Sequence, residues 1–301
     1  MTVLVAGGNG FIGSHVVKKL EEKGIPVIII DKKESTNDYR NTIKVDINDL
    51  DALSDVMVNN NLTAVIHLVG FPNVGDCEKD PLTSFKLNAL STQSLVEAMR
   101  KTDVQKIVFA SSASVYGYYV KGKASEEETP RPDTTYGLHK LFSEQIIKLY
   151  AEKYGIRFVI LRLFNVYGGD PTFRSDIVSL FIKQIINRRP LVVMGARKFR
   201  DFVHIEDVAE AFFLAYNSGV ENKVFNIGSG VRLTIEQLVN IFSNIVPNIQ
   251  VIEKEAPDDG TGIFADITLA KSLLAFNPRD PIEGLSKHIQ RYLADRVFSR
   301  V

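Results

Sequence analysis

Two residues near the middle of the chain have the types and spacing needed for proton transfer. Tyr136 and Lys140 lie four positions apart where the sequence predicts the start of a long helix, so their side chains share one face. A phenol has an ordinary pKa of about 10, and a neighbouring ammonium group stabilises the phenolate and lowers that pKa. The pair could therefore accept a proton from an alcohol while a hydride leaves the same carbon.

A serine cluster supplies a partner for this tyrosine. Ser112 belongs to the stretch 111–117 (Ser-Ser-Ala-Ser-Val-Tyr-Gly), which follows an apolar strand predicted over 105–110. Residues just beyond the carboxyl ends of parallel strands face the ligand crevice of such sheets. The Ser112 hydroxyl can therefore hydrogen-bond the same substrate oxygen as Tyr136. A tyrosine and a lysine at this spacing are common on helix surfaces, so the remaining elements decide the interpretation.

A glycine-rich turn opens the chain and predicts a site for a pyrophosphate. The apolar strand 2–6 runs directly into Gly7, Gly10 and Gly13, and an amphipathic helix follows over about 13–23. The free N–H groups and the positive dipole end of that helix attract an anion. Glycines allow the tight turn, the approach of the ligand and close packing of helix on strand. The spacing is G-x-x-G-x-x-G, and a tight loop without a ligand is the alternative.

An acidic residue follows the second strand at the spacing of a dinucleotide site. Asp31 comes directly after the apolar strand 26–30, about 20 residues beyond the glycine turn. Its carboxylate can bind both ribose hydroxyls of an adenosine and would repel a 2′-phosphate, which favours NAD over NADP. The lysines that follow weaken this preference.

The alternation of elements predicts an α/β fold with a Rossmann-like, doubly wound parallel sheet and a smaller C-terminal α+β substrate lobe. We expect an NAD-binding domain over 1–165, to which a segment near 202–226 returns, and mainly a substrate lobe over 166–301. Further strands are predicted at 42–45, 63–69, 191–194 and 249–252, and further helices at 49–58, 81–101, 135–154, 176–187, 205–217, 234–246 and 282–297.

Composition limits the classes of partner. The chain has 301 residues, with 36 Lys and Arg against 36 Asp and Glu, so nothing favours nucleic acid or an anionic membrane surface. No apolar run approaches the roughly 20 residues that a bilayer requires, no signal peptide is evident, and we expect a cytoplasmic protein. Cys77 is the only cysteine, and we interpret it as a thiol without a role. The scattered histidines predict no metal site.

These features together resemble the extended short-chain dehydrogenase/reductase superfamily, within it the NAD-dependent epimerases and dehydratases of nucleotide sugars, and among these the UDP-glucose (UDP-galactose) 4-epimerase group. The resemblance spans nearly the whole chain. It is carried by 7–13, Asp31, 46–47, 67–70, Asn88, 111–117, 136–140, 161–168 (Leu-Arg-Leu-Phe-Asn-Val-Tyr-Gly), 200–208 (Arg-Asp-Phe-Val-His-Ile-Glu-Asp-Val) and 226–230 (Asn-Ile-Gly-Ser-Gly).

The resemblance implies a role for each matching residue. The catalytic residues would be Tyr136 as base, Ser112 as its partner, and Lys140. The cofactor NAD would be held by Gly7, Gly10, Phe11, Ile12, Gly13, Asp31, Asp46, Ile47, Leu68, Val69, Gly70, Asn88, Ser111, Tyr136 and Lys140. The nucleotide-sugar substrate would be bound by Ser112, Ser114, Tyr136, Asn165 and Arg200, the last two at its diphosphate. A homodimer through the helices at 81–101 and 134–154 is also implied.

The sequence departs from the family where dehydratases carry their acids. Those enzymes have Asp-Glu after the serine or threonine, whereas this chain has Ala113 and Ser114. What remains is the minimum for epimerisation at C4: a hydride is abstracted, the 4-keto sugar turns, and the hydride returns to the other face. A related reductase or dehydrogenase, and a non-enzymatic dinucleotide sensor, are the alternatives.

A second departure concerns the diphosphate. Epimerases usually carry an arginine shortly before the Ala-Asp of the C-terminal lobe, but the segment 255–266 has acids there and no arginine. Either Arg174 or Lys254 would replace it, or the substrate differs. Ile263 falls where the family limits the size of the sugar substituent, and an aliphatic residue there leaves room for an N-acetyl group.

Overall fold

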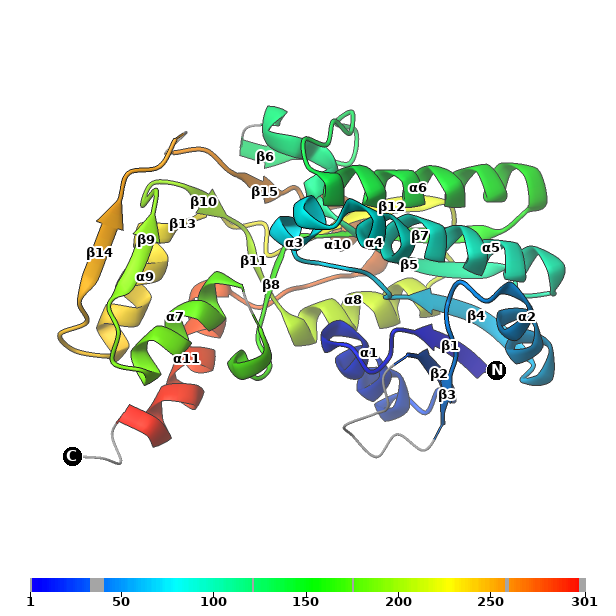
Figure 1. The fold of residues 1–301 in the computed structure, drawn as a ribbon, viewed down its shortest axis with the longest axis horizontal. Coiled ribbons are helices and arrows are strands. Elements are labelled where there is room, and N and C mark those ends of the chain that lie inside the picture. The colour runs from blue at the N-terminus through cyan, green and yellow to red at the C-terminus, as the bar shows by residue number, and fades with distance from the viewer. Residues whose placement is uncertain (1, 33–40, 121, 175, 258–259, 298–301) are drawn as a thin grey trace.

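The computed structural model describes residues 2–32, 41–120, 122–174, 176–257 and 260–297, arranged as a larger and a smaller lobe (Figure 1). The helices are α1(Phe11–Glu22), α2(Leu50–Asn59), α3(Val74–Lys79), α4(Pro81–Phe85), η1(Lys86–Leu90), α5(Ser91–Lys101), η2(Ala113–Tyr119), α6(Thr135–Tyr154), η3(Pro171–Phe173), α7(Ile177–Ile186), α8(Ile205–Asn217), α9(Ile235–Ile245), α10(Thr268–Leu274) and α11(Pro281–Val297). The strands are β1(Thr2–Ala6), β2(Val27–Asp31), β3(Thr42–Lys44), β4(Leu62–His67), β5(Lys106–Ser112), β6(Gly122–Ala124), β7(Arg157–Leu163), β8(Asn165–Tyr167), β9(Leu191–Met194), β10(Phe199–Arg200), β11(Phe202–His204), β12(Lys223–Ile227), β13(Leu233–Thr234), β14(Val251–Lys254) and β15(Ile263–Ala265).

A seven-stranded parallel sheet forms the larger lobe. Its order is β12-β7-β5-β4-β1-β2-β3, in which the chain starts at the centre and winds outward in both directions. The central strands are apolar because both of their faces are covered, and Val3 to Ala6 are fully buried. The predicted doubly wound α/β fold is confirmed. The strand order reverses beside β1, so the carboxyl ends of β1 and β4 form the edge at which such sheets bind ligands.

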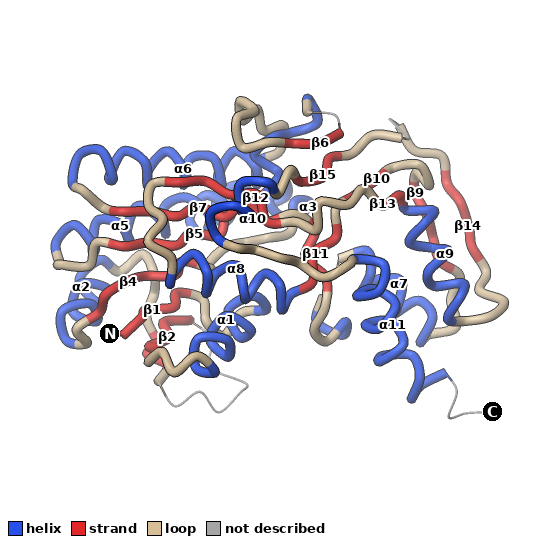
Figure 2. Tube along the Cα trace, turned by 180° about the vertical axis from the view of Figure 1, so that it is seen from behind, coloured by secondary structure: helices blue, strands red, loops and turns tan. Residues whose placement is uncertain are grey.

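Helices cover both faces of this sheet (Figure 2). One face packs on α1, α8 and α10 through a core that includes Val17, Phe212 and Leu274. The other face packs on α2, α5 and α6, through residues such as Met57 and Leu95. The site-bearing strand ends are therefore held by two continuous apolar cores, which fix their relative positions.

The helix predicted over 81–101 is interrupted by a wider turn. Pro81 begins α4, as expected for proline at a first helical position, but residues Lys86–Leu90 form a π-helical turn before α5 continues to Lys101. Sequence periodicity gave no indication of this turn. It contains Asn88, one of the predicted cofactor residues, and π-helical turns of this kind often occur at functional sites.

The smaller lobe has its own apolar core. Helices α7, α9 and α11 pack together with β9 around Phe181, Phe242 and Leu285. Helix α9 begins as predicted at Thr234, whose hydroxyl and Gln237 form a reciprocal capping box. Strand β12 lies in the large sheet beside β7; the domain boundary at 165 stays a prediction. Within the described ranges, no helix is long and apolar enough to cross a membrane.

Candidate active site

The turn between β1 and α1 has the shape of an anion cradle. Gly7 has a φ of +83°, and a Cβ there would lie 2.9 Å from the Val69 main-chain nitrogen. A Cβ on Gly13 would lie 2.1 Å from the carbonyl oxygen of Gly7. Gly10 precedes α1, and the first turn of α1 carries no acidic side chain that would compete with an anion. The predicted residues therefore fit a dinucleotide pyrophosphate by their backbone geometry.

The predicted adenosine residues lie at the ends of the neighbouring strands. The Asp31 carboxylate ends β2 and accepts a hydrogen bond from the N–H of Asn9 at 3.1 Å, which ties it to the glycine turn. Asp46 pairs with Lys32 at 2.9 Å, and hydrogen bonds from Asn48 and Lys32 lower the pKa of Asp46. Ile47 is buried behind it. This arrangement places a carboxylate next to the turn, as a ribose site requires.

Asn88 and the segment Leu68, Val69 and Gly70 after β4 meet close to Lys140. The buried Asn88 amide accepts the N–H of Phe71 at 2.9 Å and donates to the carbonyl of Phe71 at 3.1 Å. A Cβ on Gly70 would lie 2.9 Å from Asn88 Oδ1 and 3.3 Å from Lys140 Nζ. The structure thus brings together side chains that were predicted to hold the nicotinamide end of the cofactor.

Lys140 is buried, and a hydrogen bond fixes the position of its ammonium group. Its Nζ donates to the carbonyl of Ala110 at 2.9 Å and lies 6.0 Å from the Tyr136 ring centroid. Burial lowers the pKa of Lys140 to about 8, an effect that Cys77 and Glu144 oppose. Burial also raises the pKa of the Cys77 thiol.

The expected depression of the Tyr136 pKa is not seen. Burial raises the pKa of Tyr136 to about 12, although a hydrogen bond with Ser112 opposes this. The reason is geometric, since the Lys140 ammonium is directed at the Ala110 carbonyl and does not contact the phenol oxygen. A positive charge from the bound cofactor is thus what the mechanism requires to make Tyr136 a base.

The side chains of the two serines that end β5 point to opposite faces of the strand. The strand continues two residues beyond its predicted end, so Ser111 and Ser112 alternate across it. The Ser111 hydroxyl donates to Glu144 at 2.6 Å, and Glu144 forms a buried bidentate pair with Arg162. Any contact of Ser111 with a cofactor would therefore use its main chain. Ser112 accepts the N–H of Ser114 at 3.1 Å and faces a cavity.

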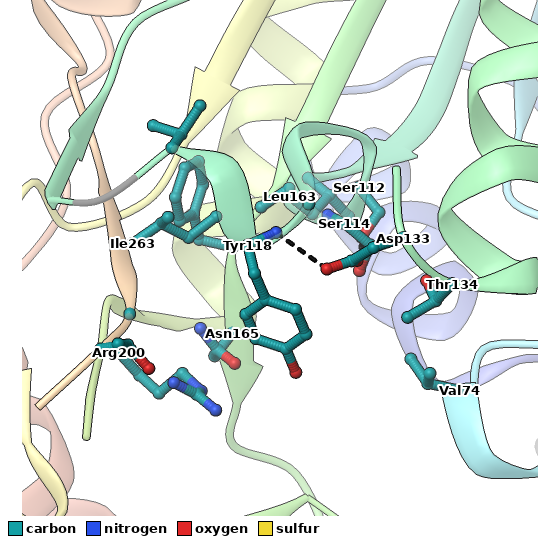
Figure 3. Close-up of a pocket in the computed structure, with 16 residues that line it drawn as sticks. Val74, Ser112, Ser114, Tyr118, Asp133, Thr134, Leu163, Asn165, Arg200 and Ile263 are labelled. Carbon is teal, nitrogen blue, oxygen red and sulfur yellow. Dashed lines mark hydrogen bonds between the residues drawn. The ribbon is translucent and has the colours of Figure 1, made fainter. Parts of the chain in front are cut away.

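That cavity has a volume of about 300 Å³ and combines four of the five predicted substrate residues with an apolar wall (Figure 3), whereas Tyr136 is not among the residues that line it. It is lined by Val74, Ser112, Ala113, Ser114, Gly117, Tyr118, Val120, Asp133, Thr134, Leu163, Phe164, Asn165, Arg200, Thr261, Gly262 and Ile263. The Asn165 amide donates to the carbonyl of Asp201 at 3.0 Å, and Arg200 donates to the carbonyl of Phe199 at 2.8 Å. The volume is at the lower end of that of small-molecule sites.

A second cavity of about 240 Å³ shares Asn165 and Arg200 with the first. It is lined by Asn165, Val166, Asp176, Ile177, Met194, Lys198, Arg200, Phe202 and Ile235. An elongated ligand can therefore extend from the serines past Arg200 into this second space. Lys198 adds a positive charge beside Arg200 that the sequence interpretation did not identify.

The two proposed replacements for the missing arginine do not line either cavity. The Arg174 guanidinium stacks on Phe11 at 3.3 Å from the ring centroid and donates to Asp176 and to the carbonyl of Val166. Lys254 ends the exposed strand β14. Asp258 and Asp259, in the segment that lacks the arginine, lie outside the described residues. Lys198 is therefore the cation that the structure places beside Arg200.

Sequence reasoning missed Tyr118, Asp133 and Lys198 among the cavity residues. Tyr118 directly follows the 111–117 motif, and Lys198 stands two residues before Arg200, so their proximity to recognised motifs was the available signal. Asp133 carried none, because it lies in a segment between the serine cluster and the Tyr136 helix that matches no recognised motif.

Known proteins are similar to this chain in both sequence and fold. The profile of the NAD dependent epimerase/dehydratase family matches residues 3–228. A protein of Methanocaldococcus jannaschii provisionally named UDP-glucose 4-epimerase is 36% identical, covering 90% of this chain and 92% of its own. The crystal structure of UDP-glucose 4-epimerase with UDP-glucose from Thermotoga maritima superposes with a TM-score of 0.90, at 31% identity over 98% of this chain and 99% of that one.

A solved relative with a different sugar is also similar. The UDP-N-acetylglucosamine 4-epimerase of Methanobrevibacter ruminantium M1, in complex with UDP-N-acetylmuramic acid, gives a TM-score of 0.85 at 29% identity, covering 98% of each chain. The profile match covers about three quarters of the chain, including the glycine turn, the serine cluster and the Tyr136–Lys140 helix. The chain belongs to the NAD dependent epimerase/dehydratase family.

Proposed function

We propose that this protein is an NAD-dependent nucleotide-sugar 4-epimerase that interconverts sugars of the UDP-glucose and UDP-galactose type. The observation that carries the proposal is the composition of the catalytic edge of the cavity. Ser112 lines it and hydrogen-bonds Tyr136, while the neighbouring positions are Ala113 and Ser114. The site thus has a base with its hydroxyl partner but no acid at the positions where dehydratases carry theirs.

The residues of this chain would divide the work as follows. Bound NAD supplies reversible acceptance and return of a hydride at the sugar carbon. Tyr136 takes the proton of the reacting hydroxyl and later gives it back, and Ser112 holds that oxygen in place. Lys140 adds a positive charge behind the phenol, on the side of the Ala110 carbonyl. The cavity keeps the 4-keto sugar from water while it turns.

Dehydration is the competing reaction, and it would need an acid in the cavity. Asp133 is the only carboxylate among the described residues that line the first cavity. Its Oδ2 accepts the main-chain N–H of Tyr118 at 2.9 Å. This contact supports a structural role for Asp133 and leaves the proposal of epimerisation in place.

The experiment is an interconversion assay with the purified protein. UDP-galactose and NAD are supplied without a reductant, and the sugar products are separated and measured. Formation of UDP-glucose with no net change in reduced cofactor supports the epimerase. Stoichiometric release or consumption of NADH would instead indicate a dehydrogenase or reductase, and binding of NAD without turnover of any nucleotide sugar would indicate a sensor.

We extend the proposal to N-acetylated sugars on the basis of Ile263. This side chain lines the cavity together with Val120 and Gly262, all of them aliphatic or without a side chain. A small apolar wall leaves room for an acetamido group. A panel of UDP-N-acetylglucosamine and UDP-N-acetylgalactosamine beside the parent sugars tests this, and strict rejection of both would contradict it.

We also propose a homodimer formed through α4, η1, α5 and α6. Their surface exposes a group of large apolar side chains, Leu82, Phe85, Leu90, Leu138, Phe142 and Leu149. The buried His139 packs beside two of these residues, with its ring centroid 5.5 Å from that of Phe85 and 6.3 Å from that of Phe142. Contiguous apolar surface of this kind marks an interface. Sedimentation of the wild type and of Phe142→Glu tests the assembly, and a wild-type monomer would overturn it.

We place the protein in the cytoplasm, where NAD and nucleotide sugars are available as cofactor and substrate. Fractionation of cells that express the full chain with a tag tests this location. Recovery of the protein in a secreted or membrane fraction would contradict it.

A further inference from the structure

Tyr118 lines the wall of the proposed substrate cavity, although most of its surface is exposed to solvent. It is 67% exposed and lines the 300 Å³ cavity. Gly117 before it has a φ of +65°, and a Cβ there would lie 2.2 Å from the Arg131 carbonyl oxygen. The N–H of Tyr118 donates to Asp133 at 2.9 Å. The backbone is therefore held on the N-terminal side of Tyr118, at Gly117 and at the Tyr118 N–H.

The ring projects between the two functional ends of the cavity. In Figure 3 it points downward from the Tyr118 backbone, with Asn165 and Arg200 to its left and Asp133 and Thr134 to its right. Burial lowers the pKa of Arg200, and Tyr118, which lines the same cavity, opposes this shift. Tyr118 lines the same cavity as the serines and Arg200, so a ligand that bridges them would lie beside this ring.

A tyrosine side chain at this place is chemically complementary to a sugar phosphate. A hexose has an apolar C–H face that packs on aromatic rings, and a phenolic O–H donates to phosphate oxygens. The apolar side chains of Val120 and Ile263 line the same cavity, so the sugar would be covered from more than one direction. An exposed aromatic side chain is then explained by the ligand that covers it.

We propose that Tyr118 is a substrate-binding residue whose ring covers the hexose and whose hydroxyl donates to the diphosphate beside Arg200. This proposal rests on the proposed function. Its consequence is retention of the oxidised sugar: between the two hydride transfers the hydride is on the cofactor, and the ring prevents the 4-keto sugar from leaving. If the keto sugar escapes, the enzyme is left with reduced cofactor and cannot turn over.

The test compares Tyr118→Ala and Tyr118→Phe with wild type. Tyr154→Ala is the matched control, because Tyr154 is 50% exposed at the far end of α6. Each protein is loaded with NAD and assayed with UDP-galactose. The measured quantities are KM, kcat, the affinity for UDP by calorimetry, and the fraction of enzyme holding reduced nicotinamide, followed by its near-ultraviolet absorbance during turnover.

Removing the ring should raise KM roughly tenfold and cause progressive accumulation of reduced cofactor, whereas Tyr118→Phe should lose about threefold in UDP affinity and accumulate little. Tyr154→Ala should match wild type. Tyr118→Ala with wild-type KM and no accumulation of reduced cofactor would overturn the proposal, and a Phe variant as impaired as the Ala variant would overturn the covering role of the ring.

The calorimetric arm separates this proposal from the proposed function. If the wild type binds UDP but does not epimerise any sugar, the proposed function fails, while a weaker UDP affinity of both Tyr118 variants still supports the contact with the diphosphate. If the wild type epimerises and the Tyr118 variants equal it in every measured quantity, only the assignment of Tyr118 fails.

Discussion

The cofactor turn and the substrate cavity lie at neighbouring strand ends, but they are assembled over very different distances along the chain. The turn places Gly7, Gly10 and Gly13 within one strand–helix unit, and its geometry follows from backbone contacts inside that unit and with Val69. The cavity joins residues from four separate strands and a loop, namely Ser112, Asn165, Arg200, Ile263 and Asp133. Short-range geometry constrains the turn tightly, whereas each wall of the cavity can change without disturbing the others.

This difference suggests how the two regions tolerate substitution. In the turn, a single Cβ meets main-chain atoms that cannot move aside, so a change alters cofactor binding as a whole. In the cavity, side chains such as Tyr118 and Ile263 meet open space that the ligand would fill. We therefore expect mutations in the first region to act through NAD and mutations in the second to act on the choice and retention of the sugar.

The largest effect should come from Tyr136, the proposed base. Tyr136→Phe removes the proton acceptor but keeps the ring, and we expect kcat to fall by roughly 10²- to 10⁴-fold, as for loss of a general base. Affinities for NAD and for UDP should stay near wild type, which calorimetry measures. Turnover within a few fold of wild type would exclude Tyr136 as the base.

A steric change in the turn should come next. Gly13→Ala places a Cβ 2.1 Å from the Gly7 carbonyl oxygen, so the turn has to open. We expect the NAD affinity to fall by roughly 100-fold and the free energy of unfolding to fall by about 2–3 kcal/mol. Fluorescence titration with NAD and denaturant unfolding measure these two quantities.

Gly24→Ala is the matched control for that change. Gly24 also has a positive φ, +71°, but a Cβ there meets no atom within 4 Å. It should lose about 1 kcal/mol from backbone strain alone and keep its NAD affinity. Equal NAD affinities of the two variants would show that the turn does not act as the cradle that its geometry suggests.

Much of the fold could be predicted because its signals are local. Helix α6 begins and ends at its predicted residues, where Thr134 caps the first turn and Gly155 adopts the left-handed conformation after the last. The paired apolar strands and the glycine turn likewise depend on neighbours in sequence. The π-helical turn at Asn88 has no such signal, since it is fixed by the contact of Asn88 with Phe71 across 17 residues.

The site was predicted less evenly. Tyr136, Lys140 and Ser112 were identified because family motifs carry them, and the structure brings them together. The raised pKa of Tyr136 and the turning of Ser111 towards Glu144 could not be foreseen, because they depend on burial and on where β5 ends. Tyr118 and Lys198 were missed for a related reason: Tyr118 lies in the short helix η2 and Lys198 in a connecting segment, and such residues become cavity residues only through tertiary packing.

Burial of Lys140 predicts a pH dependence of stability. The pKa of Lys140 is lowered to about 8, whereas a lysine in an unfolded chain has a pKa of about 10.4. Between these values the unfolded chain binds a proton that the folded protein does not, so the free energy of unfolding rises with pH. Relative to Lys140→Met, the wild type should gain roughly 2–3 kcal/mol between about pH 8 and about pH 10.

Denaturant unfolding of both proteins across this range measures the difference, in which the titration of other groups cancels to first order. The raised pKa of Tyr136 acts in the opposite direction, but only above about pH 10, where the phenol of the unfolded chain ionises first. Parallel stability curves for wild type and Lys140→Met would show that Lys140 is solvated in the folded protein.

The smallest effect should separate the two cations at the junction of the cavities. Arg200 lines both cavities and Lys198 lines only the second. A guanidinium can contact two phosphate oxygens at once, whereas an ammonium acts as a point charge. We expect Arg200→Met to weaken UDP binding roughly 10- to 100-fold and Lys198→Met only about threefold. Uridine, which lacks the diphosphate, should bind to all three proteins equally.

If Lys198→Met weakens UDP binding as much as Arg200→Met does, the lysine has taken over the place of the missing arginine. If it also weakens uridine binding, Lys198 contacts the nucleoside, and the two cavities meet at a point other than the diphosphate.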